Sequence, residues 1–221
     1  MNVKAVLPLA LLASLLVSDA DLPGPAGVPP SGGGTYSDSG PGYAVMIDYP
    51  PVAHDVTEIG DTLKAYADQL IATMRQGLVE RADTDLIPHE IDASFRHEPS
   101  PSGMVCLMAY VYAYGGGAHG MTWSRSWVYD TRCNSFIDPI ALLGDSAAFA
   151  SFAEQVRDSL LVSIDSDSAY ITEGTAPEPS NYRALLPLPD STGAIGGFLV
   201  NFSPYQVAPY AYGSFEVVVR R

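Results

Sequence analysis

Two strand-like runs separated by a short glycine-rich break constrain the fold of this 221-residue chain more than any other feature. The runs extend from Met104 to Tyr114 and from Met121 to Asp130, and both are rich in β-branched and aromatic residues. Residues 115–120 between them hold four glycines in six positions. Strand-like runs joined by a turn-forming segment are typical of an antiparallel hairpin. We therefore expect a hairpin here, with the glycine-rich segment as its loop.

Each strand of this hairpin carries an aromatic stripe. Side chains alternate across a strand, so every second residue shares a face. The two stripes are Tyr110, Tyr112 and Tyr114 on the first strand, and Trp123, Trp127 and Tyr129 on the second. Aromatic stripes stabilise sheets through cross-strand packing, and exposed ones bind sugars or proteins. We expect at least one of the two stripes to pack in the core.

The order of the other elements predicts the fold class. Period-two alternation predicts further strands, and apolar residues at helical spacing predict two helices, the second with Asp145 or Ser146 as its N-cap. The strands are expected at 43–49, 87–98, 197–202 and 215–219, and the helices at 59–78 and from 146 to about 160. Residues 165–194 read as an acidic, loop-rich segment. Because hairpin connections dominate over crossovers, we predict an α+β fold with a mostly antiparallel sheet and two packed helices.

The first residues have the form of a secretory signal peptide. Lys4 gives a positive start, Ala5 to Val17 are apolar, and Ser18 and Ala20 place small residues before a cleavage point. The apolar run is too short for a membrane anchor, which needs about 20 residues. We expect residues 1–20 to be removed and the protein to be exported to the periplasm or the extracellular space, with no membrane span after cleavage.

The remaining chain divides into three parts by composition. Residues 21–42 are rich in Pro, Gly and Ser and are expected to form a flexible linker. The folded part is expected to comprise an N-terminal α/β part with the glycine-loop hairpin, 43–135, and a C-terminal part, 136–221. Its prolines and Gly213 predict that 204–213 form a rigid, irregular connection between the last two strands, with the Tyr210 hydroxyl bonded to a buried backbone group.

The charge of the chain restricts its partners. The formal net charge is −14 at pH 7. An acidic surface repels nucleic acid and attracts basic proteins. Acidity also confers solubility, and that is the more common reason for it.

The sequence contains two cysteines, Cys106 and Cys133. An isolated pair in an exported protein usually forms a disulfide. Both positions fall at the open end of the predicted hairpin. We therefore expect a disulfide between them.

Recognisable catalytic and metal-binding patterns are missing from the sequence. His89 and His97 share a strand face but lie roughly 27 Å apart at strand rise, too far to ligate one metal. There is no Gly-x-Ser-x-Gly elbow, phosphate loop or dinucleotide fingerprint. We predict no metal, no cofactor and no enzymatic activity.

The glycine-rich loop is the sharpest local feature. Glycine permits positive φ, so the loop can turn irregularly and present His119 with exposed amides. One interpretation is a recognition loop, because loops often carry function. The other is a structural turn in which His119 only caps a neighbouring carbonyl.

Two stretches resemble a known family of exported domains. They are YAYGGGAHG, residues 112–120, and PYQVAPYAYG, residues 204–213, the latter preceded by alternating Phe198, Val200 and Phe202. The combination resembles the exported domain of RsiV-type anti-sigma factors and PdaC-type peptidoglycan deacetylases, over about residues 43–220. The sigma-binding segment, the transmembrane helix and the deacetylase domain of those proteins have no counterpart in this sequence.

The resemblance implies a binding module, because RsiV-type domains bind lysozyme and the deacetylases catalyse with a separate domain. We predict a non-enzymatic envelope domain whose ligand is a basic, lysozyme-like muramidase or peptidoglycan. The alternatives are a wall-modifying hydrolase, an accessory domain of a peptidoglycan deacetylase, or a structural envelope protein. The candidate ligand-binding residues are Gly116, Gly117, Ala118, His119, Gly120, Tyr114, Trp123, Tyr205 and Tyr210.

Overall fold

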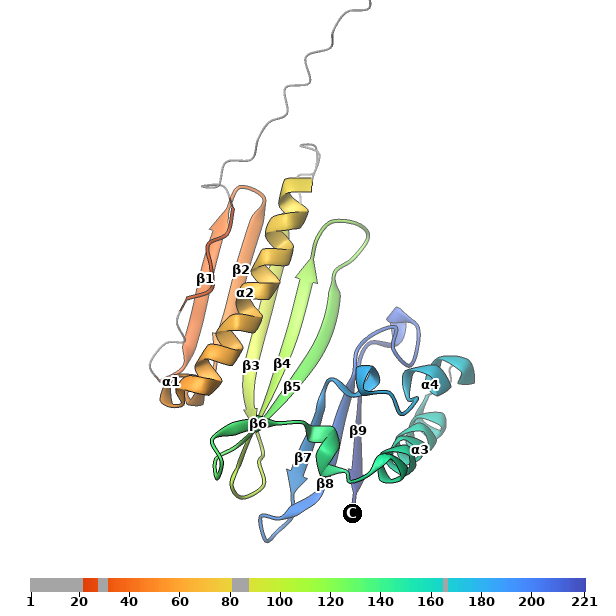
Figure 1. Ribbon diagram of the computed structural model, residues 1–221. Coiled ribbons are helices and arrows are strands. Elements are labelled where there is room, and N and C mark those ends of the chain that lie inside the picture. Colours follow the sequence, from red (N-terminus) through yellow and green to blue (C-terminus); the bar gives the residue numbers. More distant parts are fainter. Residues whose placement is uncertain (1–21, 28–31, 81–87, 165–166) are drawn as a thin grey trace, which may run out of the picture.

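Two sheets and four α-helices make up the computed structural model, which describes residues 22–27, 32–80, 88–164 and 167–221 (Figure 1). The predicted signal peptide, 1–20, lies outside the described residues. The first sheet has the order β1-β2-β3-β4-β5-β6 and the second β7-β8-β9. All pairings are antiparallel except β2 with β3, so the fold is α+β, as predicted. The strands are β1 Gly34–Gly40, β2 Tyr43–Tyr49, β3 His89–Glu98, β4 Met104–Tyr114, β5 Met121–Asp130, β6 Ser135–Ile137, β7 Leu185–Pro189, β8 Ile195–Phe202 and β9 Phe215–Arg220. The helices are α1 Val52–Asp55, α2 Thr57–Glu80, α3 Ser146–Ser163 and α4 Ser168–Gly174, with 3-10 turns η2 Pro139–Leu142, η3 Pro179–Tyr182 and η4 Tyr210–Tyr212.

The predicted hairpin is β4 and β5. Its register pairs Met104 with Asp130 and Ala113 with Met121, so the glycine-rich segment is the loop. Trp123, Trp127 and Tyr129 pack in the core beneath α2. The expectation that one aromatic stripe is a core stripe is therefore confirmed.

Helix α2 covers one face of the first sheet. Ile59, Leu63, Leu70 and Met74, which are spaced to share one helical face, are buried against the sheet. The helix also makes the crossover between β2 and β3, which therefore pair in parallel. The sequence analysis expected hairpin connections and not this crossover. Helix α2 runs back along the sheet, so the chain re-enters the sheet at the end where β2 begins, and β3 runs parallel to β2.

The second sheet packs against α3 and α4. Asp145 caps α3 by accepting a hydrogen bond from the Ala148 amide, as expected. Phe152, Val156 and Leu160 of α3 are buried over this sheet. Helix α4, the 3-10 turn η3 and strand β7 fall in the segment 165–194, which was expected to be loop-rich. No helix in the described parts of the chain is long and apolar enough to cross a membrane.

A third apolar cluster joins the two sheets. Met108 and Val128 come from the hairpin, and Leu186 and Leu199 from β7 and β8. Leu186 and Met108 are fully buried. The two sheets therefore share a continuous interior along the lower half of the hairpin in Figure 1.

Part of the expected linker is ordered against the fold. Residues 34–40 form β1, paired with β2. Ala26 is buried, and its amide donates to Asp68 of α2 over 2.7 Å. Composition favours flexibility for 21–42, but pairing with the β2 edge supplies the backbone hydrogen bonds that composition does not reveal. The first sheet also continues through β6, just past the division expected at 135.

The predicted disulfide is absent, because both cysteines are free. Cys106 pairs with Val128 and points into the apolar layer between the sheets. Cys133 lies in the turn after β5, exposed, with its sulfur 3.1 Å from the Ser135 hydroxyl. The prediction placed both at the open end of the hairpin but ignored that one faces the interior and the other solvent.

Candidate functional site

The glycine loop projects from the end of the hairpin (Figure 1). Gly116 and Gly117 have φ of 95° and 98°, which L-residues rarely adopt. The Tyr114 hydroxyl donates to the Gly117 carbonyl over 3.0 Å and so closes the turn. Gly116, Gly117, Ala118 and His119 are exposed, whereas Gly120 is buried.

The connection between β8 and β9 is anchored by buried side chains and by a side-chain hydrogen bond. Val207 and Ala208 are buried in the second core. The Gln206 side-chain amide donates to the Asn181 carbonyl over 2.8 Å. Tyr205 has a φ of 69° and is 46% exposed. A non-glycine residue held in this region marks a site where the surrounding structure dictates the backbone.

The glycine loop and this connection meet at three aromatic rings, His119, Tyr205 and Tyr210, here called the aromatic cluster. The His119 and Tyr210 rings stack with centroids 4.0 Å apart. The Tyr205 and Tyr210 centroids are 5.4 Å apart. The Tyr210 hydroxyl donates to the carbonyl of buried Gly120 over 3.1 Å, so the predicted hydrogen bond to a buried backbone group exists.

The hydrogen bonds of His119 show what the cluster can do chemically. Its Nδ1 lies 2.9 Å from the Gly120 carbonyl, which can only accept, so Nδ1 carries a proton. Its Nε2 lies 3.5 Å from the Tyr205 hydroxyl. His119 thus caps a carbonyl, as one interpretation predicted, and also presents a ring and a second nitrogen at the surface. In the described ranges, no group of three or more His, Cys, Asp or Glu side chains could hold a metal ion.

Trp123 is not part of the aromatic cluster. Its ring lies on the α2 side of the sheet, and its Nε1 donates to the Tyr66 hydroxyl over 2.8 Å. The sequence places Trp123 near the loop, but strand alternation directs its side chain to the other face.

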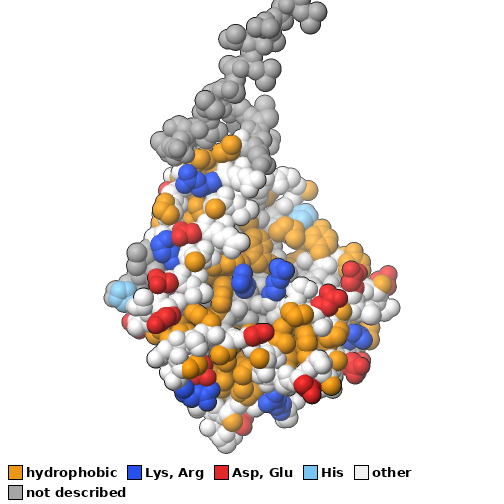
Figure 2. Space-filling model, viewed as in Figure 1, with side chains coloured by type: hydrophobic (Ala, Val, Ile, Leu, Met, Phe, Trp, Pro, Cys, Tyr) orange, Lys and Arg blue, Asp and Glu red, His pale blue; other side chains and the backbone are white. Residues whose placement is uncertain are grey.

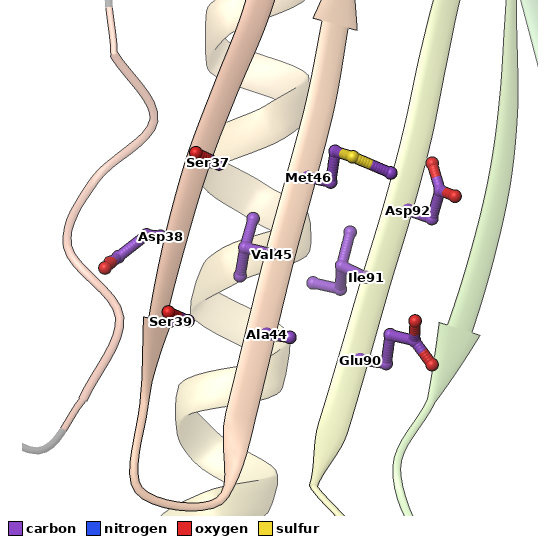
Figure 3. Close-up of a pocket in the computed structure, with 9 residues that line it drawn as sticks. All are labelled: Ser37, Asp38, Ser39, Ala44, Val45, Met46, Glu90, Ile91 and Asp92. Atoms are coloured by element: carbon purple, nitrogen blue, oxygen red, sulfur yellow. The ribbon is translucent and has the colours of Figure 1, made fainter.

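The first sheet leaves part of its other face uncovered, and sequence reasoning missed it. Tyr112 lies on this face, paired with Asp92 of β3, and Glu90 shares the face. Figure 3 shows this side with α2 behind the strands, and Glu90 and Asp92 project from β3 there. The depression seen in Figure 3 has a volume of about 530 Å³. The sequence signal for this face was the alternation of the carboxylates Glu90 and Asp92 with the buried Ile91 and Ala93 along β3.

The tyrosine stripe on this face is held by polar contacts. The Tyr110 hydroxyl lies 3.4 Å from a Glu98 oxygen, and Arg96 lies over the ring, 4.9 Å from its centroid. Burial and the Glu98 charge raise the pKa of Tyr110, so its hydroxyl stays protonated. The opposite side of the first sheet, which α2 covers, has acidic, basic and hydrophobic side chains interspersed on its surface (Figure 2).

Gly120 links the stripe to the aromatic cluster. A Cβ at Gly120 would lie 2.3 Å from the Tyr112 ring. Tyr112 therefore packs on the same glycine whose carbonyl accepts from Tyr210.

Two solved structures resemble this chain over most of its length. A DUF3298 family protein from Pseudomonas aeruginosa PAO1 has a TM-score of 0.55 and 20% identity, covering 87% of this chain and 92% of that one. The chain has the fold of a DUF3298 family protein. A second member, from Bacteroides fragilis NCTC 9343, has a TM-score of 0.50 and 13% identity, covering 85% of this chain and 88% of that one. No family model and no curated protein match the sequence.

Proposed function

We propose that this chain is a non-enzymatic binding domain of the cell envelope, exported to the periplasm or the extracellular space, whose ligand is a basic, lysozyme-like muramidase. The observation that carries the proposal is the aromatic cluster. The two stretches that resemble lysozyme-binding domains come from different sheets, yet His119 and Tyr210 stack at the surface. Tyrosine is enriched among residues that dominate binding energy at protein interfaces.

Charge supports a basic partner. The chain carries a formal net charge of −14, and Glu90 and Asp92 lie on the uncovered face of the first sheet. Long-range attraction speeds association and is screened over about 8–10 Å at physiological salt. Affinity comes from the contacts that are buried on binding. Salt and mutations are therefore expected to act on different rate constants.

The test is surface-immobilised binding kinetics with lysozyme as the probe, at low and high salt. Raising salt is expected to lower the association rate while changing dissociation little. His119→Ala and Tyr205→Ala are each expected to raise the dissociation rate about tenfold, equivalent to about 1.4 kcal/mol. Tyr170→Ala is the matched control, because Tyr170 is a similarly exposed tyrosine on α4.

Two outcomes would overturn the proposal. One is no binding by the wild type at micromolar lysozyme, and the other is unchanged kinetics in folded cluster variants. Sedimentation with insoluble peptidoglycan is run in parallel. If peptidoglycan binds through His119 and lysozyme does not bind, the ligand of the cluster is the wall polymer instead.

A further inference from the structure

Strand β9 is an edge strand of the second sheet, because β8 is the one strand it pairs with in the described part of the chain. Backbone hydrogen bonds in an antiparallel pair alternate, so every second residue directs its N–H and C=O groups away from the partner strand. The Arg221 amide donates to the Gly196 carbonyl over 3.0 Å. In the register of β8 and β9, this bond places the N–H and C=O groups of Glu216, Val218 and Arg220 on the free edge.

The same three residues share one exposed face of β9. Val218 is 43% exposed although it lies in the middle of a strand. Glu216 and Arg220 are exposed, and neither forms an ion pair with another described residue. Helix α3 packs on the opposite face, which carries the buried Val217. The free edge therefore combines unpaired backbone groups, an exposed β-branched side chain and two unpaired charges of opposite sign.

The sequence from Glu216 to Arg220, EVVVR, is complementary to itself in the antiparallel direction. When two copies of β9 pair around Val218, this residue faces its own equivalent, and Glu216 of each copy faces Arg220 of the other. Opposite charges directly across an antiparallel pair are favourable, and like charges are unfavourable. All three residues with outward backbone groups then occupy hydrogen-bonded positions.

We infer that the β9 edge binds a second copy of this chain, so that two three-stranded sheets join into one six-stranded sheet around a twofold axis at Val218. Such an interface is isologous, because both copies contribute the same surface. A register that places Glu216 opposite Val218 loses both ion pairs, since Arg220 then faces Ser214. The reciprocal charges favour a second copy over an unrelated extended segment, which would use the backbone groups without matching both charges.

The net charge of the chain does not prevent this pairing. Each copy carries a formal charge of −14. At physiological salt, charges separated by more than about 8–10 Å are largely screened, whereas side chains on paired strands lie closer than this. Pairing of one strand edge buries a small area, so we expect a dissociation constant on the order of 100 µM. The dimer uses no residue of the aromatic cluster, and the inference therefore does not depend on muramidase binding.

The experiment is sedimentation equilibrium at physiological salt over a range of protein concentrations. The wild type is expected to shift from monomer to dimer as its concentration rises. Glu216→Arg and Arg220→Glu are each expected to weaken dimerisation at least tenfold, because like charges then face each other. The double variant restores the complementarity and is expected to dimerise like the wild type. An equimolar mixture of the two single variants is expected to form mixed dimers, in which both cross-strand pairs are again opposite in charge.

Val218→Pro tests the backbone contribution. Proline is tolerated on an edge strand where the lost N–H faces solvent, so the β8 hydrogen bonds and the circular dichroism spectrum are expected to be retained. Dimerisation is expected to weaken at least tenfold. Val218→Thr is the matched control, because it is also β-branched and keeps the N–H.

Three outcomes would overturn the inference. The first is a wild type that stays monomeric up to about 1 mM, tenfold above the expected dissociation constant. The second is a folded Val218→Pro that dimerises as strongly as the wild type. The third is the absence of mixed dimers when the two charge variants are combined.

Discussion

At the scale of single residues, Tyr210 connects parts of the chain that lie far apart in sequence. Its hydroxyl reaches the carbonyl of Gly120, 90 positions earlier, and its ring supports His119. Without this hydroxyl the Gly120 carbonyl would keep only one side-chain donor, His119 Nδ1. One phenol thus fixes the distance between the two loops.

Tyr210→Phe removes that hydrogen bond and retains the ring. We expect a loss of about 1 kcal/mol in the free energy of unfolding, measured by urea denaturation. Tyr170→Phe, at an exposed position on α4, should leave stability unchanged. An unaltered midpoint in Tyr210→Phe would show that the bond does not form in solution.

The two thiols differ in their surroundings, and their reactivity should differ accordingly. Burial raises the pKa of the Cys106 thiol to about 11, whereas Cys133 is exposed. The thiolate is the reactive species, so titration with a disulfide reagent at pH 8 should find one fast thiol in the native protein. Both should react after denaturation without reductant. Failure to find two thiols in the denatured protein would mean that the cysteines are bonded.

At the scale of elements, close backbone packing positions the connection between β8 and β9. Gly174 ends α4, and a Cβ there would lie 1.9 Å from the Gln206 carbonyl oxygen. Main-chain atoms cannot move aside as a flexible side chain can. Helix α4 and the connection that carries Tyr205 are therefore locked together by a residue without a side chain.

Gly174→Ala is expected to lower the free energy of unfolding by about 1–3 kcal/mol, the usual cost of overpacking. Gly115→Ala is its matched control, since a Cβ at Gly115 meets nothing within 4 Å. Urea denaturation of both variants measures the difference. Equal stability of the two would mean that α4 and the connection are not in contact.

Elements whose signals are local could be predicted from the sequence, and elements that depend on tertiary pairing could not. Strand-like alternation predicts the hairpin, and helical spacing with the Asp145 cap predicts α3. Strand β7 contains two prolines, which argue against a strand, and β1 looks like a linker. The two loop motifs of the site were identifiable, but their contact was not, because no local pattern encodes which loops meet.

At the scale of the whole molecule, the apolar layer between the sheets makes two structural halves into one folding unit. Leu186 of β7 is fully buried against the hairpin side of this layer. Both tryptophans, Trp123 and Trp127, lie in the first sheet beneath α2. Tryptophan fluorescence therefore reports on one half while a substitution is made in the other.

Leu186→Ala is expected to cost about 2–5 kcal/mol and to shift the tryptophan fluorescence transition and the far-UV circular dichroism transition together. The wild type is the reference for both probes. A fluorescence midpoint that stays in place while the dichroism splits into two steps would show that the halves unfold independently.

Strand β1 also affects the tendency of this protein to self-associate at high concentration. Because β1 pairs with β2 alone, its removal would leave the β2 backbone as an open edge. Open edges template strand pairing between molecules, which leads to aggregation or domain swapping. Proteolytic trimming before residue 43 would thus make the protein prone to self-association, and it would also remove Ala26 and Tyr36 from the first apolar core. The segment whose composition suggests a dispensable linker therefore covers the β2 edge of the sheet.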